Sequence, residues 1–87
     1  MRLDDFLSTV GIVKRRTIAK ELAQHGMISV NGRTIKPAYQ VRINDIIHIK
    51  GTHSVTIEVV DLPVGSVPRA ERDRYFKELK NTRPAHD

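Results

Sequence analysis

The chain has 87 residues, 39% of them hydrophobic, which is enough for one small domain with a modest core. Its net charge of +5 favours a nucleic acid or an anionic membrane as partner, and the absence of cysteine excludes disulfides, zinc ribbons and thiol nucleophiles. The sequence lacks the apolar run of roughly 18 to 20 residues that a membrane span needs, and its first residues are unlike a signal peptide, so we expect a cytoplasmic protein.

Two short amphipathic helices are predicted at the start of the chain. Apolar residues recur at helical spacing within residues 2–10, and Gly11 follows where a helix would stop. Residues 14–25 form a second helical pattern, which Gly26 ends. The apolar face of this second helix consists of Ile18, Ala19, Leu22 and Ala23. Because helices this short are unstable alone, we expect the two to pack together across a tight turn.

Short antiparallel strands are predicted after Gly26. Residues 27–30 and 34–36 flank Asn31-Gly32, a dipeptide preferred in type I′ hairpin turns. Further extended segments are expected around residues 39–41, 46–49 and 55–60, with turns at 44–45 and 51–54. The predicted fold class is therefore α+β, with two helices followed by several short strands.

The last part of the chain is predicted to be an attachment to a domain formed by residues 1–62. Residues 63–87 are predicted to form a linker, a helix that begins near Arg69 after Pro68, and a tail. Tyr75, Phe76 and Leu79 would share one face of that helix. Base stacking is an alternative for these side chains, but their helical spacing favours packing against the domain.

The positive charge is concentrated near the N-terminus. Residues 1–36 have a net charge of +4, residues 37–62 of −1 and residues 63–87 of +2. Projection of the second helix at 100° per residue gives a basic stripe beside the apolar face. The stripe consists of Arg16, Thr17, Lys20 and Gln24.

Lys14 and Arg15 stand at the first turn of the second helix, where the helix dipole is already positive. A phosphate would relieve that repulsion, and arginine adds a planar fork that binds two oxygens at once. The alternative is an ordinary solvated face, because three consecutive basic residues are fewer than in most tracts that mark nucleic-acid patches.

Several spaced elements of the sequence resemble the S4 RNA-binding domain over about residues 1–50. They are Met1-Arg2-Leu3-Asp4-Asp5-Phe6-Leu7, the spacing Arg16-x-x-Ala19-x-x-Leu22-x-x-x-Gly26, Val30-Asn31-Gly32, and Asp45. The resemblance implies an S4-like (αL) fold in which two helices pack on a small antiparallel sheet and RNA backbone lies along the second helix and the hairpin turn. The RNA-facing residues that it implies are Arg2, Lys14, Arg15, Arg16, Thr17, Lys20, Asn31 and Lys36.

The resemblance gives Asp4 a structural role, as a carboxylate that orients nearby groups such as Arg2. Two positions depart from the family pattern. Asn44 stands where glycine is usual, but asparagine tolerates a left-handed backbone, so the turn should survive. Asp5 stands where a basic or neutral residue is commoner, and its charge should weaken phosphate attraction locally.

Among free-standing S4 proteins, the length and the segment 12–21 resemble the RqcP group of bacterial ribosome-associated quality control. That resemblance implies a monomer that binds 50S subunits carrying peptidyl-tRNA, contacts 23S rRNA and tRNA, stabilises the P-site tRNA and supports RqcH-directed C-terminal alanine tailing. A recycling factor like heat-shock protein 15 and a protein-interaction adaptor are the alternatives. A membrane-surface role is weaker, because neither basic segment has a large apolar face.

Catalysis and cofactors are not expected. The four histidines lack the close spacing of a metal site, and no cysteine or carboxylate cluster accompanies them. The serines are scattered, without the Gly-x-Ser-x-Gly elbow of a hydrolase. We therefore expect a protein that binds RNA without a metal, a cofactor or a catalytic residue.

Overall fold

The computed structural model of the chain describes residues 1–51 and 54–82. In chain order the elements are the helices α1 (Leu3–Thr9) and α2 (Arg16–Gln24), the strands β1 (Ile28–Val30), β2 (Arg33–Thr34), β3 (Ile46–Ile49) and β4 (Ser54–Val59), the 3-10 helix η1 (Arg69–Arg74), and the strand β5 (Phe76–Thr82). This arrangement confirms the α+β class. Part of the turn predicted at 51–54 and the end of the predicted tail lie outside the described residues.

The apolar stripe of α1 forms the centre of the core. Leu3, Phe6 and Leu7 are fully buried, and Val10 at the end of the helix is nearly so. Helix α2 packs on α1 through its small residues Ala19 and Ala23, both buried. The predicted place of Ile18 in the apolar face is wrong, because its side chain is 42% exposed. The two alanines and the partly buried Leu22 form the contact strip, and Ile18 lies outside it on the helix surface.

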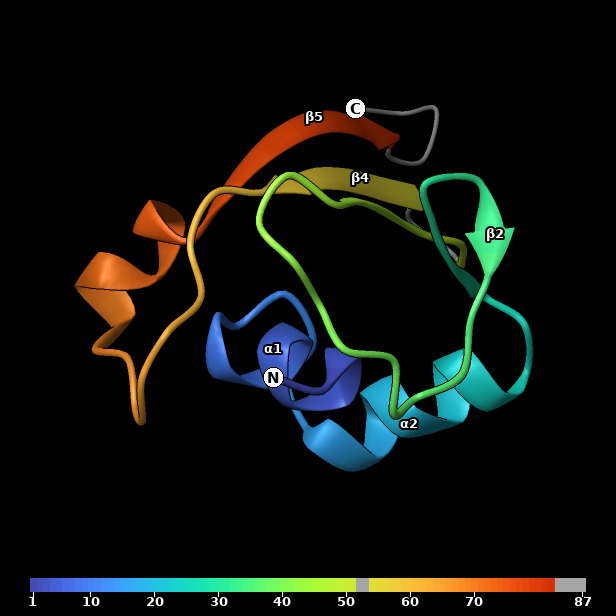
Figure 1. Cartoon of the computed structure of the whole chain (residues 1–87), viewed down its shortest axis with the longest axis horizontal. Helices are drawn as coiled ribbons and strands as arrows, with labels where there is room; N and C mark the ends of the chain where they lie inside the picture. Colours follow the sequence, from blue (N-terminus) through green and yellow to red (C-terminus); the bar gives the residue numbers. More distant parts are fainter. Residues whose placement is uncertain (52–53, 83–87) are drawn as a thin grey trace.

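The five strands form one antiparallel sheet in the order β2-β1-β3-β4-β5. Both α-helices lie on one side of this sheet (Figure 1). The β1–β2 hairpin pairs Val30 with Arg33 across Asn31-Gly32, and both turn residues have positive φ, at 52° and 84°. These angles confirm the predicted type I′ turn, which requires φ > 0 at both central residues.

Residues 39–41 do not join the sheet but pair with the start of the chain. Gln40 forms an antiparallel bridge with Arg2, and the backbone N–H of Val41 donates to the carbonyl oxygen of Met1 at 2.9 Å. The backbone N–H of Leu3 likewise donates to the Tyr39 carbonyl oxygen at 2.8 Å. These bonds hold the residues just before α1 against the segment that leads into β3.

The predicted C-terminal helix is confirmed at its start, but it is a short 3-10 helix and does not continue through residues 76–82. Residues 69–74 form the 3-10 helix, and β5 runs antiparallel to β4 from the pair Val59 and Phe76 onward. The apolar residues of this segment have helical spacing, but the segment forms a strand. The reason is that the edge of β4 offers a row of backbone hydrogen-bonding groups, which a paired strand satisfies. Tyr75 and Phe76 do pack against the core, as predicted, whereas Leu79 is 46% exposed. No helix within 1–51 and 54–82 is long and apolar enough to cross a membrane.

Candidate nucleic-acid interface

The carboxylate of Asp4, in the first turn of α1, is the centre of a polar cluster. Arg2 Nε donates to Asp4 Oδ1 at 3.1 Å, and Arg2 Nη2 donates to Asp4 Oδ2 at 3.0 Å. The backbone N–H of Asp5 donates to the same Oδ1 at 2.9 Å. Two parallel bonds from one guanidinium hold the planar group in a single orientation.

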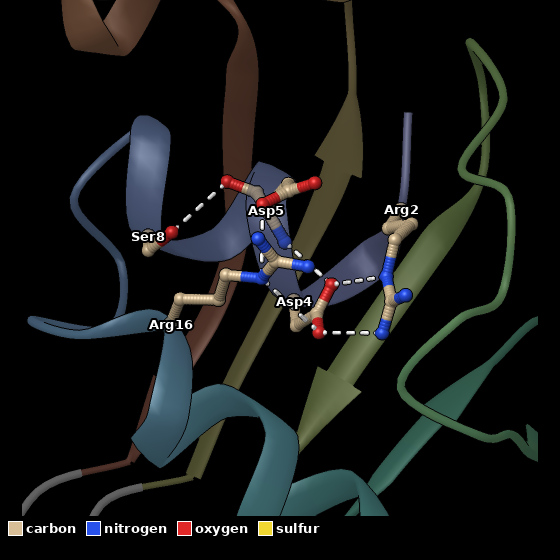
Figure 2. Close-up of polar contacts among 5 residues, drawn as sticks. All are labelled: Arg2, Asp4, Asp5, Ser8 and Arg16. Carbon is tan, nitrogen blue, oxygen red and sulfur yellow. Dashed lines mark hydrogen bonds and ion pairs between the residues drawn. The ribbon is translucent and has the colours of Figure 1, made fainter.

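A second arginine reaches this cluster from α2. Arg16 Nε lies 3.1 Å from Asp5 Oδ1 and 3.6 Å from Asp4 Oδ2. Figure 2 shows both guanidinium groups facing the Asp4 carboxylate from different elements. The Asp4 side chain is fully buried, whereas those of Arg2 and Arg16 are 37% and 54% exposed. Both arginines are thus anchored on the inside and open to solvent on the outside.

The ion pair between Arg2 and Asp4 favours the charged form of both groups. Burial alone would raise the pKa of Asp4, but the hydrogen bonds from Arg2 and from the Asp5 backbone, with the charges of Arg2 and Arg16, outweigh it. The net result is a pKa of Asp4 below its usual 3.8. The hydrogen bond to Asp4 raises the pKa of Arg2. Because two cations face two carboxylates, the cluster itself is close to neutral, so it can offer an anion directed donors but little net charge.

Net positive charge comes from neighbouring residues in α2 and just before it. Lys14, Arg15, Thr17 and Lys20 are all exposed. The helix begins at Arg16, two residues later than predicted, so Lys14 and Arg15 precede it, with Arg15 at the N-cap. The first turn has no acidic residue and no side-chain cap. Free backbone N–H groups, the helix dipole and these cations all attract an anion to this end of α2.

The two remaining candidates, Lys36 and Asn31, differ in what their side chains contact. Lys36 is exposed on the rim of a groove of about 460 Å³ that also includes Ala23 and Gln24, so it lies close to the C-terminal half of α2. Asn31 instead uses its side chain within the fold. Its Nδ2 donates to Asp45 Oδ1 at 3.1 Å, and its Oδ1 accepts a bond from the backbone N–H of Ile46 at 2.9 Å.

The contact of Arg16 with Asp4 and Asp5 is not predicted by the sequence. Asp5 was expected only to oppose phosphate, but it also holds Arg16. No local signal predicts this contact, because it exists only after α1 and α2 have packed. In total, the structure brings Arg2, Arg16 and the basic residues at the start of α2 to one region, whereas Asn31 stabilises a turn.

Comparison with known proteins identifies similar chains. The sequence profile of the S4 domain matches residues 1–47. A protein named RQC P-site tRNA stabilizing factor from Halalkalibacterium halodurans is 38% identical over 85 residues, which cover 97% of this chain and 94% of that protein. A protein of the same name from Helicobacter pylori J99 is 37% identical over 80 residues, covering 87% of this chain and 93% of that protein.

The fold has a counterpart among solved structures. Heat shock protein 15 from Vibrio cholerae, described as a trimeric structure, superposes with a TM-score of 0.84 and 25% sequence identity. The likeness covers 91% of this chain and 81% of that protein, so it extends well beyond the residues that the S4 profile matches.

Proposed function

The chain belongs to the S4 domain family, and from this membership we propose that it is an RNA-binding factor of ribosome-associated quality control. The observation that carries the proposal is the pair Arg2 and Arg16, which meet at the buried Asp4 carboxylate while their outer sides face solvent. Guanidinium groups held in this way meet a phosphate with little loss of side-chain freedom.

The surface suits RNA backbone better than base edges. Arg2 and Arg16 supply oriented donors, and the other cations and polar groups of the surface surround them. These are Lys14, Arg15, Thr17, Lys20 and Lys36. Contacts of this kind set position and neutralise charge, whereas base specificity needs side chains that reach the bases. We propose that the protein reads the shape of folded RNA.

More specifically, we propose that the protein binds 50S subunits that still carry peptidyl-tRNA, contacts both 23S rRNA and tRNA, and stabilises the P-site tRNA. In this role it acts as a cytoplasmic monomer, without catalysis of its own, and supports RqcH-directed alanine tailing of the stalled chain. The names of the relatives support the role at the P-site tRNA.

The proposal is tested by Arg16→Ala in a sucrose gradient of cell extract. We expect the folded variant to leave the large-subunit fractions, because it loses a donor beside Asp4 and a charge at the start of α2. Lys77→Ala is the matched control, since it removes one exposed positive charge from β5, on the other side of the molecule from α2 (Figure 1). Unchanged co-sedimentation of Arg16→Ala would contradict the proposal.

A recycling role like that of heat-shock protein 15 is the second candidate, and the likeness of fold favours it. The two roles differ in what happens to a stalled chain when the protein is absent. Deletion of the gene should abolish C-terminal alanine tails if the protein supports tailing, and should leave them unchanged if it acts only in recycling. A protein-interaction adaptor would differ from both, because its ribosome association would not weaken steeply with added salt.

A further inference from the structure

A second polar pocket lies at the other end of α1, away from Asp4. It has a volume of about 280 Å³ and is lined by Ser8, Thr9, Ser66, Val67 and Arg72. Arg72 belongs to η1, the orange 3-10 helix that lies beside α1 on the side away from β2 (Figure 1). The pocket is therefore separate from the surface formed by α2.

The position of Arg72 depends on close contact with Gly11. A Cβ atom at Gly11 would lie 2.7 Å from Arg72 Nη1 and 2.9 Å from its Cδ, so a larger residue at this position would displace the Arg72 side chain. Gly11 also has φ of +77°, a conformation that glycine adopts without strain. The Arg72 side chain thus lies against the turn that ends α1.

Arg72 has an unused hydrogen-bond donor. Its Nε is buried and has no hydrogen-bond partner among the residues that the structure describes. The nearby carboxylate of Glu71 lies 3.4 Å from Arg74 Nη1, with which it forms an ion pair. A buried donor without an acceptor is unfavourable, and such a group points to a missing partner.

We propose that this pocket binds a phosphate group of the RNA backbone, as a second anchoring point that rests on the proposed RNA-binding function. The Arg72 guanidinium would donate to the phosphate oxygens, as arginine commonly does. The hydroxyl groups of Thr9 and Ser66 would add donors from the two walls of the pocket. Ser8 cannot add one in the same way, because its Oγ donates to the carbonyl oxygen of Asp5 at 3.1 Å.

The site would extend RNA binding beyond the S4 domain. Ser66 and Arg72 lie outside residues 1–47, which match the S4 profile, whereas Ser8 and Thr9 lie within them. A structural explanation competes with the proposal, in which Arg72 serves only to neutralise the C-terminal end of α1, whose last turn has no basic residue. The two explanations differ in whether the guanidinium binds an added anion.

Nuclear magnetic resonance with inorganic phosphate tests the pocket without any ribosome. At constant ionic strength, we expect the Nε–H signal of Arg72 to shift with phosphate until it saturates, and that of the exposed Arg69 to stay in place. In Ser66→Ala, which keeps Arg72, half-saturation should need more phosphate. A shift of Arg72 that is absent, or equal with chloride, would overturn the proposal.

RNA binding by the same pocket is tested with purified large subunits at several salt concentrations. We expect Arg72→Gln to lower the slope of log affinity against log salt by about one, as for the loss of one phosphate contact, while Arg69→Gln keeps it unchanged. An unchanged slope in the folded Arg72→Gln variant would overturn this second anchoring point. If the unmodified protein fails to bind large subunits, the proposed function itself is wrong, and the phosphate titration still decides whether the pocket binds phosphate.

Discussion

The first turn of α1 and the turn before β3 each bury one carboxylate, yet they surround it with different partners. Asp4 is 1% exposed and faces two arginines that are partly open to solvent. Asp45 is 6% exposed and accepts bonds from Tyr39 Oη at 2.8 Å, from the backbone N–H of Arg42 at 2.9 Å and from Asn31 Nδ2 at 3.1 Å. All three of these donors are neutral groups.

The difference separates the proposed binding surface from a purely internal support. At Asp4, the carboxylate orients cations whose outer sides remain free for an anion. At Asp45, the carboxylate joins the hairpin turn at Asn31 to Tyr39 and Arg42 in the segment that leads into β3. Burial of an aspartate therefore does not reveal its role, whereas the charge and exposure of its partners do.

The largest expected effect on stability is that of Asp45→Ala. It leaves the donors of Asn31, Tyr39 and Arg42 without their acceptor, so we expect a loss of about 3 kcal/mol in the free energy of unfolding, measured with urea. Asp61→Ala, at an exposed position, is the control and should change stability little. The salt dependence of RNA binding should stay unchanged if Asp45 only supports the fold.

Asp4→Asn should have a smaller effect on stability but should also weaken binding. The amide keeps one acceptor but places a donor against two guanidinium groups, and the partial exposure of the arginines limits the loss to about 2 kcal/mol. Affinity for large subunits, measured in parallel, should fall because Arg2 and Arg16 lose their shared anchor. Wild-type affinity would contradict the role of Asp4.

Asp5→Asn is the matched control for Asp4→Asn, because it removes a charge from the same helix turn while the Asp4 carboxylate stays in place. It loses the 3.1 Å ion pair with Arg16 but also removes a negative charge beside the proposed phosphate-binding surface. We expect a smaller loss of affinity for large subunits than in Asp4→Asn, because Arg2 keeps its bonds to Asp4.

Tyr39→Phe should remove one hydrogen bond at Asp45, with an expected loss of about 1 kcal/mol by urea unfolding near neutral pH. Burial, and then the hydrogen bond and charge of Asp45, raise the pKa of Tyr39 above 10.0. The stability contributed by the phenol is therefore present below pH 10 and lost as the pH rises through the folded-state pKa. The difference in the free energy of unfolding between wild type and Tyr39→Phe should shrink in that alkaline range. A constant difference would contradict the stabilising role of the Tyr39 hydroxyl.

The smallest expected effect on stability is the loss that follows protonation of Asp4 at low pH. Its pKa in the folded protein is lower than 3.8, so its contribution to stability is present above pH 3.8 and lost as the pH falls through the folded-state pKa. The loss should be smaller than that caused by substitution, because a protonated carboxyl group still accepts a hydrogen bond from Arg2. Urea unfolding of wild type and Asp4→Asn at decreasing pH measures it, and curves that stay parallel below pH 3.8 would exclude it.

The sequence by itself determined the features that depend on neighbouring residues. The buried stripe of α1 follows from helical periodicity, and the hairpin turn follows from Asn31-Gly32. Asn44 has φ of 78°, the left-handed conformation that asparagine was expected to tolerate. In these cases a local pattern determines backbone conformation before any distant contact forms.

Only the tertiary structure decided which distant groups meet, and where the secondary structure differs from the one that the local pattern predicts. Residues 76–82 form a strand because the edge of β4 binds them, although their apolar spacing also suits a helix. The Arg16 contacts with Asp4 and Asp5, and the contact of Arg72 with Gly11, depend on how whole elements pack. Periodicity specifies which face of an element is apolar, but the partner of a charged side chain is specified by three-dimensional proximity.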